Sequence, residues 1–193
     1  MPRLFIGVEL EREPRQAAAD AIDALRQAIA RRRIAISARW VPVENLHITL
    51  WFIGEVTDER AQSVHEVLAP PFRIPPFSIR LAGFGAFPPT GEPRVLWMAL
   101  GDGLAGLRVL HEETGRRLAP LGYEPGHREY SAHLTLARVK EGPPRSGIAD
   151  FRRLLRDVPA DAGRSRVAAV TLFRSRLSPK GAVYEPVLRV PLE

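Results

Sequence analysis

Two short segments of this chain, one in each half, place a threonine two residues after a histidine. His47 precedes Thr49 and His133 precedes Thr135, and aliphatic residues surround both pairs. Because alternate side chains of a β-strand point to opposite faces, each histidine would share a face with its threonine, and the aliphatic residues would fill the other face. Two imidazoles can act as a general acid and a general base near neutral pH.

Facing strands would give these groups a definite chemistry. One neutral imidazole can take a proton from an attacking water, and the other, protonated, can give a proton to a departing ribose oxygen. The hydroxyls of Thr49 and Thr135 can donate hydrogen bonds to non-bridging phosphate oxygens, where charge builds up during transfer. A 2',3'-cyclic phosphate suits such a site, since its ring is strained and only one leaving oxygen needs a proton. The pattern therefore predicts phosphate chemistry that needs no metal ion and no other cofactor.

Composition and charge limit the remaining possibilities. The 193 residues suit one domain or two closely joined lobes. Because the chain has no cysteine, disulfides, thiolate nucleophiles and cysteine-based zinc sites are excluded. The net charge of +6 favours a polyanionic partner, although an arginine-rich proteome would explain it equally well. No apolar run reaches the roughly 20 residues that span a bilayer, and no secretory signal is recognisable. We therefore expect a cytoplasmic protein without a membrane partner. The sequence leaves the oligomeric state open, and a monomer is the default expectation.

The pattern of apolar residues predicts how these motifs are positioned. Helices are expected at about 14–33, 58–68, 103–120 and 146–157, and strands at about 3–10, 46–53, 77–84, 94–100, 131–139, 165–176 and 182–190. Helices and strands intermix, and hairpin-like connections outnumber βαβ crossovers, so we predict an α+β fold with mainly antiparallel sheets. The repeated histidine strand indicates two pseudo-twofold lobes that face a central cleft within a single domain, residues 1–193.

The surroundings of the two motifs carry a resemblance to a known family. The runs are RWVPVENLHITLWFIGEV at 39–56 and HLTLAR at 133–138. They strongly resemble the RNA 2',3'-cyclic phosphodiesterases of bacteria and archaea, LigT-like members of the 2H phosphoesterase superfamily formerly called 2'-5' RNA ligases. The resemblance covers nearly the whole chain. It implies a bilobal fold whose motifs line one cleft, and hydrolysis of RNA 2',3'-cyclic phosphate ends to 2'-phosphates. It further implies that His47 is the proton donor and His133 the proton acceptor.

Four other residues are weighed against this chemistry. By strand alternation Trp51 shares the face of the first histidine, where it would either stack on a nucleobase or serve as a core or rim aromatic. Arg138 matches the family motif and is a candidate phosphate ligand, but strand parity places it opposite the second histidine unless a bend or bulge intervenes. Tyr130 would either contact the substrate or pack. His111, beside a glutamate in an expected helix, is interpreted as solvent-facing or salt-bridged.

Two other functions remain open from the sequence. The same groups could join a 5'-hydroxyl to the cyclic phosphate through a 2'-5' bond, which is the reverse reaction. A non-catalytic module that binds RNA ends is the third possibility, and the two intact motifs argue against it. All three functions require the same partner, an RNA or nucleotide that ends in a 2',3'-cyclic phosphate.

Overall fold

The computed structural model describes residues 1–124, 129–140, 147–178 and 181–193, which form one nine-stranded sheet with four α-helices. The strands are β1 (Arg3–Glu9), β2 (Ala38–Trp40), β3 (His47–Glu55), β4 (Phe77–Phe87), β5 (Val95–Asp102), β6 (Leu134–Val139), β7 (Asp161–Val167), β8 (Ala169–Ser178) and β9 (Gly181–Pro191). The helices are α1 (Arg12–Arg31), α2 (Asp58–Leu68), α3 (Leu104–Leu118) and α4 (Ile148–Asp157). Among these residues, no helix is both long and apolar enough to cross a bilayer.

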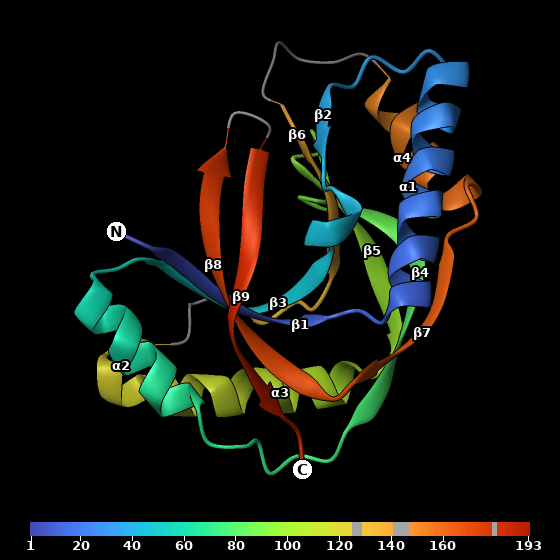
Figure 1. Cartoon of the computed structure of the whole chain (residues 1–193). Coiled ribbons are helices and arrows are strands. Elements are labelled where there is room, and N and C mark those ends of the chain that lie inside the picture. Colours follow the sequence, from blue (N-terminus) through green and yellow to red (C-terminus); the bar gives the residue numbers. More distant parts are fainter. Residues whose placement is uncertain (125–128, 141–146, 179–180) are drawn as a thin grey trace.

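The sheet consists of two halves that meet at the motif strands. Its order is β7-β4-β5-β6-β3-β1-β8-β9, with β2 also beside β6, and all of these neighbouring strands are antiparallel. The junction between β3 and β6 is a single residue pair, Ile48 with Leu134. The sheet curls strongly, so that the β8–β9 hairpin and the end of β6 with β2 rise on opposite sides of its middle (Figure 1). The α+β, two-lobed fold is confirmed, with the two expected sheets joined through this pair.

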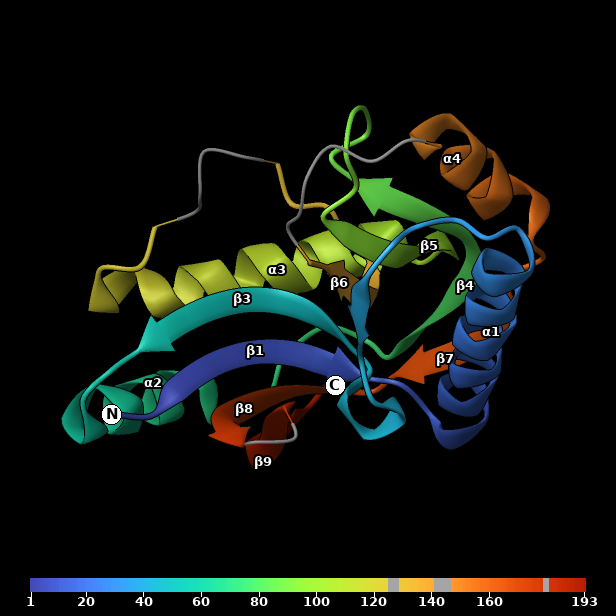
Figure 2. The same ribbon diagram turned by 90° about the horizontal axis from the view of Figure 1, so that it is seen from above.

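The helix that precedes each motif strand packs against the other half of the sheet. The helix α1 precedes the first motif strand in the chain but packs against β7 of the second half, where α4 also covers β4. The helix α3 precedes the second motif strand but runs along β3 of the first half, and α2 packs against it (Figure 2). Each motif strand thus follows a helix that covers the other half.

One expected strand proves to be two. Residues 165–176 are interrupted at Ala168, where β7 ends and β8 begins. The strand β7 pairs with β4 in the second half, whereas β8 pairs with β1 in the first. The apolar pattern continues through the interruption, so it does not show that the chain crosses between halves. The strand β2 was also not expected, because three residues are too few for a periodicity.

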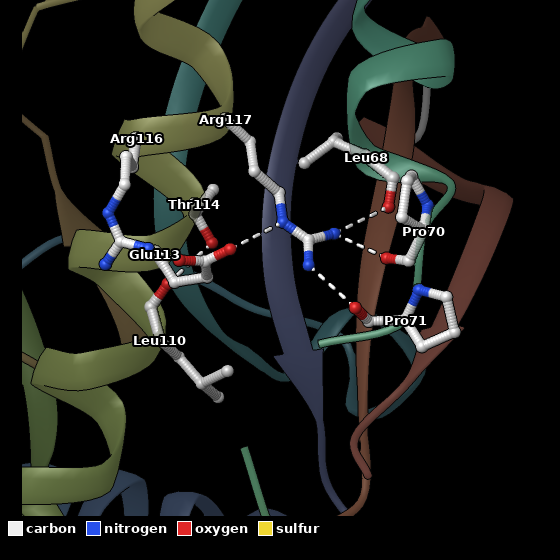
Figure 3. Close-up of polar contacts among 8 residues, drawn as sticks. All are labelled: Leu68, Pro70, Pro71, Leu110, Glu113, Thr114, Arg116 and Arg117. Carbon is white, nitrogen blue, oxygen red and sulfur yellow. Dashed lines mark hydrogen bonds and ion pairs between the residues drawn. The ribbon is translucent and has the colours of Figure 1, made fainter. Parts of the chain in front are cut away.

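Arg117 of α3 contacts the C-terminal end of α2. The Arg117 side chain donates from Nε to Oε1 of Glu113 at 2.9 Å and lies over the ring of Phe72, 3.8 Å from its centre. Its remaining nitrogens donate to the carbonyl oxygens of Leu68, Pro70 and Pro71 (Figure 3). These carbonyls lie at and just beyond the C-terminal end of α2, where helix carbonyls lack partners within the helix. The contacts hold α2 against α3, the helix that lies along β3.

Candidate active site

The four motif residues come together around the pair that joins the halves. Ile48 and Leu134 face each other with no exposed surface. Because β3 and β6 are antiparallel, one further step of the register in each direction brings His47 beside Thr135, and Thr49 beside His133. All four point to the face opposite the buried pair and are partly exposed. A local twofold axis through the pair relates the two motifs.

The first histidine is held by the residues just before it. Its Nδ1 lies 2.7 Å from the carbonyl oxygen of Asn45, and since a carbonyl can only accept, Nδ1 carries a proton. In the neutral ring Nε2 is then an acceptor, and it lies 3.0 Å from Oγ1 of Thr49. Asn45 is itself buried and donates from Nδ2 to the carbonyl of Ala182 at 2.7 Å. The chain before β3 therefore fixes the tautomer and the direction of His47.

Aromatic side chains support this imidazole. Phe5 of β1 lies 4.7 Å from the ring of His47, centre to centre, and stacks on Phe173 of β8 at 4.9 Å. Tyr184 of β9 presents its edge to the imidazole at 5.3 Å. The three rings come from successive strands, β1, β8 and β9. These three rings form an aromatic floor that shields one side of His47 from water.

The second histidine repeats this arrangement. Nδ1 of His133 lies 2.7 Å from the carbonyl oxygen of Ser131, again two residues earlier, so its Nε2 is also left as the acceptor of the neutral ring. Phe87 meets its ring edge-on at 5.1 Å. A cavity of about 350 Å³ lies beside it, and Trp97 and Tyr130 are among its lining residues. The second half thus adds an aromatic-lined hollow next to its imidazole.

The surroundings lower the pKa of both histidines. Burial is the main cause in each case, and it is partly opposed by the hydrogen bond from Nδ1, which raises the pKa. The charge on His133 further lowers the pKa of His47, and the charge on Arg138 further lowers that of His133. Protonation of one imidazole therefore disfavours protonation of the other. Such a pair readily divides into one acid and one base.

The carboxylate on the strand beside His47 is engaged elsewhere. Glu9 pairs with His47 across the strands, but its Oε2 accepts from Oγ1 of Thr171 at 3.0 Å and lies 3.6 Å from Nε of Arg189.

The described part of the chain contains no group of three or more histidine, aspartate or glutamate side chains that could hold a metal ion.

A β-bulge in β3 changes the expected position of Trp51. Thr49 pairs with Gly7 and Trp51 pairs with Ile6, which leaves Leu50 as an extra residue. The extra residue inverts the alternation, so Trp51 is buried and donates from Nε1 to the carbonyl of His111 on α3 at 2.9 Å. The prediction that Trp51 shares the face of the first histidine is therefore wrong, and its core interpretation is the one observed.

After the first bulge of β3, a different aromatic residue reaches the site face. Phe52, the residue after Trp51, pairs with Phe5, and the second irregularity of β3 comes only after it, between Phe52 and Gly54. The rings of Phe52 and Phe5 lie 6.3 Å apart, and Phe52 is 69% exposed. Sequence alternation alone does not identify this residue.

The strand β6 carries the same kind of bulge. Thr135 pairs with Trp97 and Ala137 with Leu96, which leaves Leu136 as the extra residue. Arg138, which follows Ala137 and pairs with Val95, therefore lies on the face of His133. The bulge that its phosphate-binding interpretation required is present. Arg138 follows its histidine at the same interval as Phe52 follows His47, so the two occupy equivalent positions in the two halves.

Two stacked rings connect the motifs. The hydroxyl of Tyr130 donates to the carbonyl of Thr49 at 3.1 Å, and burial raises the pKa of Tyr130, which keeps this donor protonated. Its ring stacks on His111 with centres 4.2 Å apart and planes 4° from parallel. Nδ1 of His111 lies 3.0 Å from the carbonyl of Leu50, the bulged residue. The prediction that His111 faces solvent or a salt bridge is wrong, and Tyr130 packs between the two motifs.

Comparisons with known proteins show the family of this chain. The family model described as LigT like Phosphoesterase matches residues 13–97 and 102–184. A protein of Aeropyrum pernix named RNA 2',3'-cyclic phosphodiesterase is 36% identical over 84% of this chain and 93% of its own length. One of the same name from Thermotoga maritima is 28% identical over 99% of this chain and 96% of its own.

Solved structures show the same fold. The crystal structure of TT0787 of Thermus thermophilus has a TM-score of 0.73 and 30% identity, and covers 98% of this chain and 97% of its own. That of Escherichia coli LigT complexed with 3'-AMP has a TM-score of 0.70 and 24% identity, over 100% of this chain and 99% of its own. With its model matched along most of the length, the chain belongs to the LigT-like phosphoesterase family.

Proposed function

We propose that this protein hydrolyses RNA 2',3'-cyclic phosphate ends to 2'-phosphates, with His47 and His133 as the proton-transferring groups. The arrangement of the four motif side chains around one strand pair carries this proposal. Each histidine ties its Nδ1 to a backbone carbonyl and so keeps Nε2 for proton transfer. The names of the relatives from Aeropyrum pernix and Thermotoga maritima support the substrate class.

The proposed reaction gives each histidine one proton transfer. Neutral His133 takes a proton from a water molecule, whose oxygen attacks the phosphorus. The bond from phosphorus to the 3'-oxygen breaks, and protonated His47 gives its proton to that oxygen, which leaves a 2'-phosphate. An anionic phosphate between the rings raises the pKa of His47 and so favours the acid form that this step needs. Each histidine contributes on the order of 10²–10⁴ in rate.

The remaining groups hold the substrate. Thr49 and Thr135 donate their hydroxyls to the non-bridging oxygens, where negative charge develops. Arg138 adds a positive charge on the same face, near enough to lower the pKa of His133. The cavity of about 350 Å³ beside His133 offers room and aromatic surface for the nucleobase. Because one chain supplies both histidines, a second subunit is not needed.

Product analysis tests this function. The purified protein is incubated with an oligonucleotide that ends in a 2',3'-cyclic phosphate, with and without EDTA, and the product is identified by phosphorus NMR. We expect a 2'-phosphate at the same rate in both samples. A 3'-phosphate, or no turnover, would contradict the assignment.

The same assay separates the two other functions. Addition of an oligonucleotide with a free 5'-hydroxyl would yield a longer, 2'-5'-linked product if the reverse reaction dominates. Salt-sensitive binding of the cyclic-phosphate oligonucleotide without any turnover would indicate a module that only binds RNA ends.

A further inference from the structure

Two arginines face each other across neighbouring strands beside the site. The short strand β2 pairs with β6 so that Arg39 lies directly opposite Arg138. Arg138 also pairs with Val95 of β5, which lies two residues before Trp97, the partner of Thr135. Since residues paired across strands share a face, and alternate residues of one strand do too, Arg39 and Arg138 both point to the side of Thr135. Both are exposed.

This pair lacks the carboxylate partners that some other exposed arginines have. Arg80 pairs with Asp161 at 2.8 Å and Arg164 with Asp102 at 2.7 Å. Neither Arg39 nor Arg138 has a carboxylate partner among the described residues. Like charges directly opposite each other in a sheet are destabilising, so the arrangement is costly in the free protein. An anion between the two guanidinium groups would remove that repulsion.

The place of the pair indicates which anion it would bind. Arg138 lies two register steps beyond Thr135, roughly 7 Å along the strand, and Arg39 lies one strand further out. A phosphate held by Thr49 and Thr135 would therefore lie farther from Arg39 than an anion bound between the two arginines. The equivalent position in the first half is occupied by Phe52, which carries no charge. The positive charge of the two arginines is therefore found on only one side of the site, that of the second half.

We propose that Arg39 and Arg138 form a second phosphate subsite, which binds the phosphate on the 5' side of the terminal nucleotide while its cyclic phosphate lies between the histidines. This inference rests on the proposed function and extends it. The enzyme would prefer an RNA end to a free nucleoside cyclic phosphate. A bidentate guanidinium suits a phosphodiester, and Arg138 lies between the two phosphates.

The smallest probe of this subsite is a pair of nucleotides that differ by one phosphate. We compare kcat/KM for a nucleoside 2',3'-cyclic phosphate with and without a 5'-phosphate, in wild type and in Arg39→Ala. The 5'-phosphate should raise wild-type kcat/KM about 10-fold, as expected for a charge-assisted contact, and this gain should be lost in R39A. Arg39→Lys should restore part of it. Arg73→Ala, which removes another exposed charge, in the connector between α2 and β4, should keep the full gain.

Binding of the products tests the subsite independently of turnover. The affinity ratio of a nucleoside 2',5'-bisphosphate to a nucleoside 2'-phosphate should fall in R39A, and this ratio should depend less on salt concentration than in wild type, because one charge contact is lost. An unchanged ratio in R39A would overturn the subsite. If the ratio is unchanged because both affinities fall equally, Arg39 lies at the reacting phosphate instead. A protein that binds both nucleotides with the predicted ratio but hydrolyses neither would instead refute the proposed function alone.

Discussion

At the residue scale, the reactivity of the two imidazoles depends on what lies against them. His47 is backed by Phe5, and its Nδ1 is occupied by the carbonyl of Asn45. His133 has Phe87 and the carbonyl of Ser131 in the corresponding roles. Neither imidazole can therefore use its Nδ1 proton in catalysis without the loss of this hydrogen bond. The geometry leaves Nε2 of both rings for the proposed proton transfers.

Gly7 provides the space that His47 occupies. It pairs with Thr49, and a Cβ at this position would lie 2.7 Å from the carbonyl oxygen of Ile48 and 3.3 Å from Cδ2 of His47. The backbone oxygen cannot move without a shift of β3, so Gly7→Ala should displace the histidine. We expect kcat to fall by at least ~10-fold and stability by about 1–3 kcal/mol, measured by hydrolysis and urea unfolding. Gly101→Ala, with nothing within 4 Å of the new Cβ, should leave both unchanged.

The lowered pKa values of the histidines predict how stability depends on pH. Burial holds the pKa of His47 and His133 below the ordinary value of 6.5, so in the unfolded chain both bind protons at a pH where the folded protein does not. Stability should therefore decrease as the pH falls through about 6.5. Urea unfolding at pH 7.5 and 5.5 measures this loss. It should be smaller in the His47→Gln, His133→Gln double variant, and an equal loss would contradict the burial of these rings.

At the element scale, the bulges in β3 and β6 decide which side chains reach the site. Each adds one residue after the threonine, and each turns the following positions to the opposite face. The carbonyl of Leu50 accepts from His111, and that of Leu136 accepts from the backbone N–H of Val41. Both bulges are thus stabilised by contacts from distant segments.

The bulges also explain what the sequence could and could not predict about the site. His47, Thr49, His133 and Thr135 precede the bulges, so plain alternation places them correctly on one face. Trp51 comes after the first bulge, and alternation therefore assigns it to the wrong face. A bulge depends on partners such as His111, which lies far away in the chain, and no local pattern reports it.

The hydrogen bond from Tyr130 to Thr49 predicts that Tyr130 positions the motifs for catalysis. Tyr130→Phe keeps the stacked ring but removes the hydrogen bond to the carbonyl of Thr49. We expect a loss of about 1 kcal/mol in stability and a several-fold fall in kcat with little change in KM, because the bond sets the spacing of the motifs rather than contacting substrate. Tyr123→Phe, whose ring lies under the guanidinium of Arg60, is the matched control. Equal kcat values in the two variants would refute this role.

At the scale of the whole molecule, the two halves exchange covering helices. The helix α1 lies on β7, and α3 lies on β3, so neither half keeps its core without the other. The fold class was predictable because long amphipathic segments and alternating strands mark it. The exchange was not, since periodicity shows that a helix has a buried face but not which sheet covers it.

This exchange predicts that the chain unfolds as a single domain. Loss of either half would expose apolar faces of α1 or α3, so a folded half should not persist alone. Unfolding in urea should give coincident transitions by tryptophan fluorescence, which reports on Trp51 and Trp97 in different halves, and by far-UV circular dichroism. Two separated transitions would show that the halves are independent domains.

We propose that one histidine from each half acts on the same phosphorus. The most direct measurement is kcat/KM for a cyclic-phosphate oligonucleotide in His47→Ala, His133→Ala and the double variant, with folding checked by circular dichroism. Each single variant should lose ~10²–10⁴ in rate, and the double variant should lose far less than the product of the two losses, because the groups act as a unit. Wild-type activity in either folded single variant would contradict the account.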